Sequence, residues 1–575
     1  MQIAVAFAIM LAFVFGLTFM ELWNGIVAPP IDPDEASANL AVGSGNNTDG
    51  AVGNLRNRDI GGDAKMLSKP ASKTGGGQGS TTKMSPVTTA PHAVQLKPQL
   101  TTSLCPYTFK VYVYPLPNTL GAVTHGAGAR RNKTLHVCQK CILEQFALEY
   151  IVEDFFINTC ARTANPEEAD FFYLPLLRDA EFRTNFPKRA PSLAEQALLL
   201  LLEKNDSSVF VKTFGVTDAY WRRHDGADHV IVMPAPVTNL RHESSRRGFF
   251  HYTKHLLRPI FVAVEYSKGF VDTFPICTRQ KNILVPYPTT DPDLFSGHLY
   301  SKKIERKSLL YYAGGVHGDC VQIRKAMKFL ILNSTALPNV VAPIPSNMRE
   351  REHGFAAAIF CPIPVGDSPS SKRMYDVLNF GCIPVVVSDD LVWAYSEDVG
   401  GWLQPTHFAL QIPQIIVQLP VDSLVERYRS NPTDLGVLPV SHTRIYDILL
   451  HVRDSGSGYE FWKGHYINPL VQVLMRVPKE DIVFLQQGVA AAAPHYRYYT
   501  MNKSITTIPT ASHRYPDGGA MHNLARKLSM RIEGGKGNID SIAAACDAER
   551  DRKRKPHTHE WRFPCDRDAG DGRPL

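Results

Sequence analysis

The sequence lacks several patterns that mark common classes of protein. It has no strong charge of one sign, because 62 lysines and arginines stand against 55 acidic residues and leave a formal net charge of +7. So mild an excess does not by itself indicate nucleic-acid binding. Ten cysteines at irregular spacing in 575 residues fit neither a small disulfide-bonded scaffold nor a paired zinc ribbon. We find no internal repeat.

The sequence also lacks a convincing metal site. Asp291-Pro292-Asp293 has the spacing of a DxD motif, but aspartates flanking a proline are typical of a turn. His136, Cys138 and Cys141 form one CxxC with a nearby histidine and no second matching pair, so a disulfide or buried thiols are favoured there. We therefore predict a protein that requires neither a metal nor another cofactor.

What is present first is an apolar N-terminus. Ile3–Met20 is a run of 18 uncharged, mostly apolar residues, close to the minimum length of a membrane-spanning helix. Residues 1–28 are expected to form a signal anchor, and a signal peptide cleaved near Ala28 is the alternative. No lysine or arginine precedes the run, so charge determines its orientation poorly. Both interpretations send the chain into the secretory pathway.

Two further segments have the composition of disordered chain. Residues 29–100 are rich in Gly, Ser, Thr, Pro and Asn and hold few large apolar side chains, which is typical of a flexible stem. Residues 533–575 are polar and charged, and we expect a disordered tail, with a Cys546–Cys565 pairing as one option. Five Asn-x-Ser/Thr sequons agree with a lumenal body: Asn46, Asn132, Asn205, Asn333 and Asn502.

Strands alternate with helices between these segments, which indicates parallel α/β sheets. We expect two successive α/β domains, residues 101–300 and 301–532, with a cleft at the carboxyl ends of their strands. The expected strands of the first domain include 109–114, 171–174, 229–233 and 281–286, and its expected helices include 192–204 and 251–264.

The stretch FCPIPVGDSPSSKRMYDVLNFGCIPVVVSDD, residues 360–390, is the centre of the second domain. Ser368 is suited to cap a helix with Pro369 in its first position, and Gly381 suits the helix end. Residues 383–387 form an apolar, mostly β-branched run typical of a buried parallel strand. A loop followed by a helix is a natural anion site, because the first amides of the helix point toward the ligand.

Four segments, taken in order, resemble the exostosin family of glycosyltransferases. DSPSSKRMYDVLNFGCIPVVVSDD is similar to the family's Gly-Asp-x-Pro-Ser-Ser-x-Arg-x-x-(Asp/Glu) run followed by Gly-Cys-(Ile/Val)-Pro-Val and Ser-Asp. FKVYVYPLP, NPEEADFFYLP and YWRRHDGADHVIV are similar to three upstream family segments. The match spans about residues 105–490. One departure is Trp393-Ala394-Tyr395, where the family often has Leu-Pro-Phe.

The resemblance implies a GT-B architecture of two Rossmann-like domains, closest to the single-domain plant, algal or protist members. It also implies an inverting, type II Golgi membrane enzyme that transfers a sugar from a nucleotide sugar, with UDP as the expected nucleotide, to a glycan or glycoprotein. The alternatives are a non-catalytic exostosin-like subunit and a lumenal carbohydrate-binding protein. Homo- or hetero-oligomers with other glycosyltransferases are compatible with the sequence, and no nucleic-acid partner is expected. The sugar and the linkage stay open.

Site residues follow from the matched motifs and from the chemistry of sugar transfer. The leaving diphosphate requires positive charge and amide donors, the ribose requires an acceptor, and the acceptor hydroxyl requires a base. We assign the phosphates to Arg324, Ser370, Ser371 and Arg373, the ribose to Asp376, and the base to Asp228 or His229. The alternative for Asp228 and His229 is a turn cap and a satisfied structural histidine. Other expected cleft residues are Trp221, Arg223, His317, Asp367 and Asp389.

Overall fold

The structure is a computed structural model, and the residues that it describes all belong to one compact unit, residues 98–575. It describes residues 105–115, 145, 147–175, 193–234, 258–289, 305–316, 320–334, 348–366, 368–456, 461–462, 465–498, 519–535 and 537–553. The predicted anchor and stem lie outside these residues. None of the helices in the described segments is both long and apolar enough to cross a membrane.

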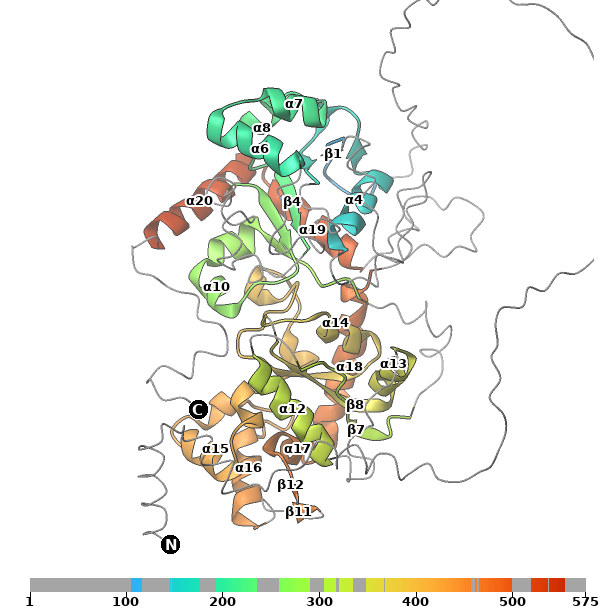
Figure 1. Cartoon of the computed structure of the whole chain (residues 1–575), viewed down its shortest axis with the longest axis vertical. Helices are drawn as coiled ribbons and strands as arrows, with labels where there is room; N and C mark the ends of the chain where they lie inside the picture. The colour runs from blue at the N-terminus through green and yellow to red at the C-terminus, as the bar shows by residue number, and fades with distance from the viewer. Residues whose placement is uncertain are drawn as a thin grey trace, which may run out of the picture. The chain divides into compact units, whose positions relative to one another are not determined.

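Residues 105–289, here called the first lobe, form a six-stranded parallel sheet of order β2-β1-β3-β4-β5-β6 (Figure 1). Every residue of β3, β4, β5 and β6 is buried, as expected of a parallel sheet with both faces covered. The predicted strand at residues 229–233 is confirmed. The strands are β1 Val111–Val113, β2 Arg162–Thr163, β3 Phe171–Tyr173, β4 His229–Met233, β5 Ile260–Ala263 and β6 Ile283–Leu284.

The helices of the first lobe are short. They are α4 Leu148–Asn158, α6 Leu193–Lys204, α7 Ser208–Phe214, α8 Ala219–Arg222, α10 Lys268–Thr273 and the π-helix η6 Cys277–Lys281. The expected helix at residues 251–264 is wrong at its end, because residues 260–263 are strand β5. The segment Ile-Phe-Val-Ala pairs with β4 and β6, and this pairing is a tertiary choice that a short apolar run does not reveal by itself.

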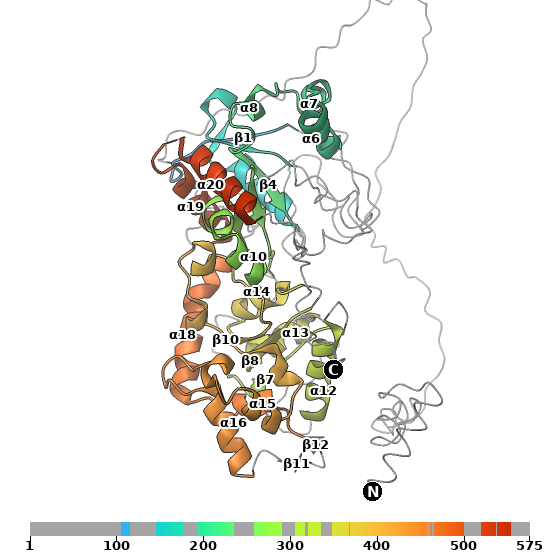
Figure 2. The same cartoon turned by 90° about the vertical axis from the view of Figure 1, so that its left-hand side faces the viewer.

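Residues 305–498, the second lobe, contain a four-stranded parallel sheet of order β10-β9-β8-β7 (Figure 2). The strands are β7 Ser308–Leu310, β8 Ala358–Pro364, β9 Ile383–Val387 and β10 Leu410–Gln411, and β11 Phe461–Trp462 pairs separately with β12 His465–Tyr466. The helices are α12 Val321–Ser334, α13 Met348–Ala357, α14 Lys372–Asn379, α15 Val421–Arg427, α16 Ile445–Asp454, α17 Pro469–Leu474 and α18 Lys479–Tyr496. Two parallel sheets in a mixed α/β fold are consistent with a GT-B-like glycosyltransferase.

Helix α14 confirms part of the prediction for the central stretch and corrects its start. Met374, Val377 and Leu378 are completely buried, and Gly381 ends the helix region in the left-handed conformation with φ 72°. The helix begins at Lys372 with Ser371 as N-cap, so the expected Ser368 cap is wrong. The hydroxyl of Ser368 is instead used in a contact with the first lobe.

After α18 the chain returns to the first lobe. Helices α19 (Ala520–Ile532) and α20 (Gly537–Lys553) lie beside β4 and α10 in both views (Figures 1 and 2). Arg531 on α19 donates to the carbonyls of Lys281 at 2.7 Å and Asn282 at 2.6 Å. Helix α19 also contacts the second lobe, in which it was expected, because Lys527 Nζ donates to Gly400 O at 2.7 Å and the Tyr395 hydroxyl donates to Ala520 O at 2.7 Å. It therefore bridges the two lobes, and α20 is ordered structure in the expected disordered tail.

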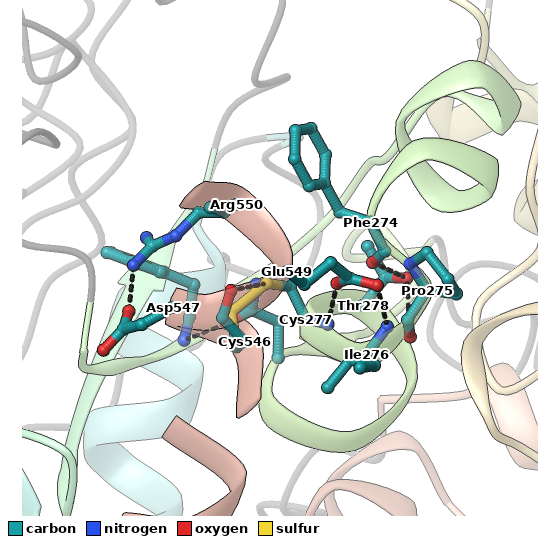
Figure 3. Close-up of a disulfide and its surroundings, with 11 residues drawn as sticks. Phe274, Pro275, Ile276, Cys277, Thr278, Cys546, Asp547, Glu549 and Arg550 are labelled. Carbon is teal, nitrogen blue, oxygen red and sulfur yellow. Dashed lines mark hydrogen bonds and ion pairs between the residues drawn. A yellow bond between two sulfur atoms is a disulfide. The ribbon is translucent and has the colours of Figure 1, made fainter. Parts of the chain in front are cut away.

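A disulfide fastens α20 to the first lobe (Figure 3). Cys546 bonds Cys277, so its expected pairing with Cys565 is wrong. One turn further along α20, the buried carboxylate of Glu549 accepts the amides of Ile276 at 3.1 Å and Cys277 at 3.0 Å. These amides begin π-helix η6, and an anion at the amino end of a helical segment is favourable. Cys105–Cys160 and Cys361–Cys382 are the other disulfides whose partners both lie in the described residues.

Candidate functional site

The loop between β8 and α14 lies at the carboxyl edge of the second sheet, where parallel sheets bind ligands. Short contacts hold this loop: Gly366 N donates to Ser368 O at 3.1 Å, and Ser388 Oγ donates to Pro369 O at 2.8 Å. Ser388 directly follows β9, so the ends of both neighbouring strands shape the loop. The loop leads straight into the first turn of α14.

Several polar atoms at or near the start of α14 are buried and have no hydrogen-bond partner among the described residues. Ser371 is the N-cap, yet its side chain makes no capping bond, and Ser371 Oγ has no hydrogen-bond partner in the part of the chain that is described. The same holds there for one guanidinium nitrogen of Arg373 and for the hydroxyl of Tyr312. The guanidinium of Arg373 lies 4.9 Å from the centre of the Tyr312 ring. Buried donors are normally satisfied, so these atoms fit a site that receives a ligand.

Positive charge gathers around the same point. Burial lowers the pKa of Arg373, and the nearby charges of Arg324 and Arg351 lower it further, while Tyr312 and Asp376 oppose them. Arg324 on α12 is 5% exposed and donates from Nε to Val365 O at 3.3 Å. Arg351 on α13 was not predicted, and its Nε is a buried donor that lacks a partner among the described residues. A buried excess of cations is relieved by an anion.

Two glycines make room for these guanidinium groups. A Cβ at Gly366 would lie 1.6 Å from a terminal nitrogen of Arg324. A Cβ at Gly314 would lie 2.6 Å from a terminal nitrogen of Arg373 and 2.3 Å from the Tyr312 hydroxyl. Any side chain at either position would displace an arginine, so glycine at these positions leaves the space that the two guanidinium groups fill. We call Tyr312, Arg324, Arg351, Ser371 and Arg373 the α14 cluster.

The other predicted residues of the second lobe have protein partners. Ser370 donates both its amide and its hydroxyl to Glu265, so these donors face the first lobe. Asp376 is 5% exposed and accepts from Lys372 Nζ at 2.6 Å. Asp389 accepts the amide of Gln414 at 2.9 Å, which orders the chain after β10. His317 and Asp367 lie outside the described residues.

The predicted residues of the first lobe form a different cluster. His229 is completely buried, with Nδ1 2.8 Å from Asp228 Oδ1 and Nε2 2.9 Å from the Tyr114 hydroxyl. Arg223 Nε donates to Asp228 Oδ2 at 3.0 Å. The ring of Trp221 lies against His229 at a centroid distance of 4.5 Å. We call Tyr114, Arg223, Asp228 and His229 the amino-edge network, because His229 is the first residue of β4. Trp221 packs beside this network, and its Nε1 has no hydrogen-bond partner among the described residues.

This arrangement favours a structural role for Asp228 and His229, which were assigned as the base from the sequence. Ligands of parallel sheets bind at the carboxyl edge, whereas Asp228 and His229 stand at the amino edge of the first sheet. Both ring nitrogens of His229 have protein partners, so a substrate hydroxyl would have to displace the Tyr114 hydroxyl or the Asp228 carboxylate to reach one. Although burial raises the pKa of Asp228, His229 and Arg223 outweigh it and hold that pKa below its usual value. The contacts are those of a structural network, as are the positions of Trp221 and Arg223.

Glu265 is the residue at the junction of the lobes that the sequence reasoning missed. It lies two residues beyond β5, at the carboxyl edge of the first sheet, and is 2% exposed. Its only signal in the sequence is an acidic residue directly after a buried apolar strand. Within the described ranges, no group of three or more His, Cys, Asp or Glu side chains is arranged to hold a metal ion.

Two parallel sheets with a buried cationic cluster at a strand-to-helix loop have the organisation of a GT-B-like glycosyltransferase. Comparison with known families agrees: the model of the "Exostosin GT47 domain" matches residues 106–419. The match covers more than half of the chain, so this protein belongs to the exostosin GT47 family and is a glycosyltransferase.

Curated relatives share about a quarter of their residues with this chain. The "Probable beta-1,4-xylosyltransferase IRX10L" of Arabidopsis thaliana is 25% identical over an alignment of 347 residues that covers 56% of this chain and 75% of the relative. A "Probable glucuronosyltransferase" of Oryza sativa subsp. japonica is 24% identical over 56% of this chain and 74% of its own. "Probable glucuronosyltransferase 47 A" of Physcomitrium patens is 24% identical over 66% of this chain and 78% of its own.

Proposed function

We propose that this glycosyltransferase takes a sugar from a UDP-sugar and transfers it, with inversion, to a glycan or glycoprotein acceptor in the Golgi lumen. The membership of the exostosin GT47 family supports sugar transfer. The apolar run Ile3–Met20 supports a single-pass type II anchor. The Golgi location and the inversion rest on the family resemblance.

The α14 cluster is the observation that carries the donor assignment. A nucleotide sugar leaves as a diphosphate, whose negative charge grows as the sugar departs. Ser371 Oγ and the terminal nitrogen of Arg373 are buried donors without partners in the described part of the chain, and they lie near the charges of Arg324 and Arg351. Arginine forks match phosphate oxygens in pairs. We therefore place the diphosphate at these four residues.

Two further roles follow from the contacts around the cluster. Asp376 stays our proposal for the ribose, and its bond to Lys372 orients the carboxylate that a ribose hydroxyl would share. Burial lowers the pKa of Lys372, and Asp376 opposes that shift. The base belongs on the carboxyl edge of the first sheet rather than at Asp228 or His229, because the acceptor must approach from the ligand side.

We propose that transfer needs no metal ion. The three arginines of the α14 cluster supply the positive charge that a divalent cation supplies in other transferases. In this case UDP binding by the full chain keeps its Kd in excess EDTA. A loss of UDP binding on chelation, restored by Mg²⁺ or Mn²⁺, would overturn the metal-free proposal.

The names of the relatives narrow the first donors to test. Curated relatives are named as xylosyltransferases and glucuronosyltransferases, so UDP-xylose and UDP-glucuronic acid come first. UDP-galactose, UDP-arabinose and UDP-N-acetylglucosamine complete the panel. The purified full chain is assayed for release of UDP with and without added oligosaccharides, with Arg373→Ala in parallel. We expect one UDP-sugar to be turned over by the natural chain and not by Arg373→Ala. The absence of UDP binding would contradict the donor site.

A further inference from the structure

Glu265 joins the first lobe to the loop that carries the α14 cluster. Two residues separate it from the end of β5, and its side chain is almost completely buried at the junction between the lobes. All of its described bonds go to the second lobe. Oε2 accepts from Ser368 Oγ at 2.6 Å, from Ser370 N at 2.9 Å and from Ser370 Oγ.

These bonds hold the loop strongly. Hydrogen bonds to a carboxylate are shorter and stronger than those between neutral groups. One oxygen that collects a backbone amide and two hydroxyls fixes both the main chain and the side chains of residues 368–370. The segment after Glu265 adds backbone contacts of its own, because Lys268 N donates to Asp390 O at 2.9 Å and Ser267 forms a β-bridge with Leu391. Residues 265–268 of the first lobe thus contact two segments of the second lobe, the loop before α14 and the chain after β9.

The neighbouring serines consequently have different surroundings. Ser370 turns its donors to Glu265, whereas Ser371 has extended backbone angles, φ −158° and ψ 155°, and keeps its hydroxyl out of the helix cap. Successive side chains along extended backbone point in opposite directions. With Ser370 held on one side by Glu265, Ser371 is held on the other, two residues before Arg373. The bond of Ser370 therefore determines where Ser371 points.

We propose that Glu265 is a positioning residue for the nucleotide sugar: its carboxylate holds Ser368 and Ser370 so that Ser371 and Arg373 meet the donor diphosphate. The inference rests on the proposed function, because it assigns a cause to the geometry of the same donor site. It also gives the first lobe a direct part in donor binding. A preformed loop loses less entropy on binding than one that must be ordered by the ligand.

Two substitutions separate positioning from simple charge repulsion. Glu265→Gln keeps the shape and removes the charge, and Glu265→Asp keeps the charge and shortens the reach by one methylene. If Glu265 positions the loop, both weaken the binding of UDP to the full chain, by about tenfold or more, as measured by calorimetry. If Glu265 were only a negative charge near a phosphate site, Glu265→Gln would tighten UDP binding and Glu265→Asp would leave it unchanged. Either of those results overturns the proposal.

Glu549 provides a matched control. It is also a buried glutamate that accepts hydrogen bonds at the start of a helical segment, but it lies on α20 beside the Cys277–Cys546 disulfide (Figure 3). Glu549→Gln should lower the thermal midpoint and leave the Kd for UDP unchanged. If Glu549→Gln weakens UDP binding as much as Glu265→Gln does, a general loss of stability of the fold explains both effects and the proposal fails.

A double-mutant cycle tests the route through Ser370. Ser370→Ala removes one hydroxyl bonded to Glu265 and retains the backbone amide, so folding should be preserved even where Glu265→Gln disturbs it. Since the two residues act as a unit, the double variant should bind UDP more tightly than the product of the single effects predicts. Independent effects would overturn the proposed route. Failure of the natural chain to bind UDP would overturn the proposed function and this inference together, whereas UDP binding lost in Arg373→Ala and unaltered in Glu265→Gln would overturn this inference alone.

Discussion

The amino-edge network and the α14 cluster contain similar side chains, but they differ in how many of their polar atoms have hydrogen-bond partners. Each combines an arginine with the hydroxyl of a buried tyrosine. In the amino-edge network, His229 has partners on both ring nitrogens, and Asp228 accepts from two neighbours. In the α14 cluster, Ser371 Oγ, the Tyr312 hydroxyl and a nitrogen of Arg373 have none in the described ranges. A completed network stabilises the fold, and an incomplete one is prepared for a ligand.

The difference teaches that residue type alone does not mark a site. Histidine and aspartate at the start of a strand have the chemistry of a base, and the sequence reasoning chose them for that reason. In the structure, His229 is hydrogen-bonded to Tyr114 and Asp228 to Arg223, so both side chains are engaged in protein contacts. In contrast, Ser371 and Arg373 each have a buried hydrogen-bond donor without a partner among the described residues, and a ligand could accept from these donors.

The largest expected effect comes from breaking the completed network. Asp228→Asn removes the charge that Arg223 and His229 share in a buried place, and such a change costs about 3–5 kcal/mol of the free energy of unfolding. Chemical denaturation of the full chain measures it. Asp447→Asn is the control, because its pair with Arg444 is exposed and contributes at most about 1 kcal/mol. If Asp228→Asn left stability unchanged and weakened UDP binding, Asp228 would belong to the donor site and not to a structural network.

The pH dependence of the same variant sharpens the comparison. The pKa of Asp228 is below its unfolded value of 3.8, so its contribution is present above that pH and is lost as the pH falls through the lowered pKa. The natural chain and Asp228→Asn should therefore differ most near neutral pH and converge in acid below pH 3.8. A difference in stability that stays constant from neutral pH into acid would contradict the assigned charge.

Breaking the incomplete cluster should affect binding instead of folding. Arg373→Ala removes a charged donor to phosphate, for which about 1.5–3 kcal/mol, roughly ten- to a hundredfold in the Kd for UDP, is expected. Its thermal midpoint should not fall, because the guanidinium is buried among other cations. Arg429→Ala, at an exposed pair with Glu426, is the control for loss of an arginine. A large loss of stability in Arg373→Ala would place this residue with the structural network.

A pair of tyrosine substitutions gives the smallest and most selective test. Tyr114→Phe removes the hydroxyl that bonds His229 and should cost about 0.5–1.5 kcal/mol of stability with no change in UDP binding. Tyr312→Phe removes a hydroxyl that has no partner among the described residues, so stability should be unchanged and UDP binding a few-fold weaker. If the two variants changed stability and UDP binding equally, the presence or absence of hydrogen-bond partners would not distinguish the two clusters.

Local features of the central stretch were predictable because they depend on near neighbours in the chain. The buried side of α14, the strand β9 and the left-handed Gly381 follow from apolar spacing, β-branched residues and glycine's tolerance of positive φ. The start of α14 was not predictable from a capping pattern. Glu265 takes the Ser368 hydroxyl, and Glu265 is 103 residues away in the chain.

The sequence by itself determined the family, the alternation of strands and helices, and a loop whose serines and arginine suit a phosphate. The tertiary structure alone decided which edge of each sheet a residue occupies and which polar atoms are already paired. It placed His229 at the amino edge, Glu265 against Ser370, Arg351 near enough to Arg373 for its charge to lower the pKa of Arg373, and α20 on the first lobe through Cys277 and Cys546. The physical reason is that satisfaction of a buried polar atom depends on partners distant in the chain, which no local pattern records.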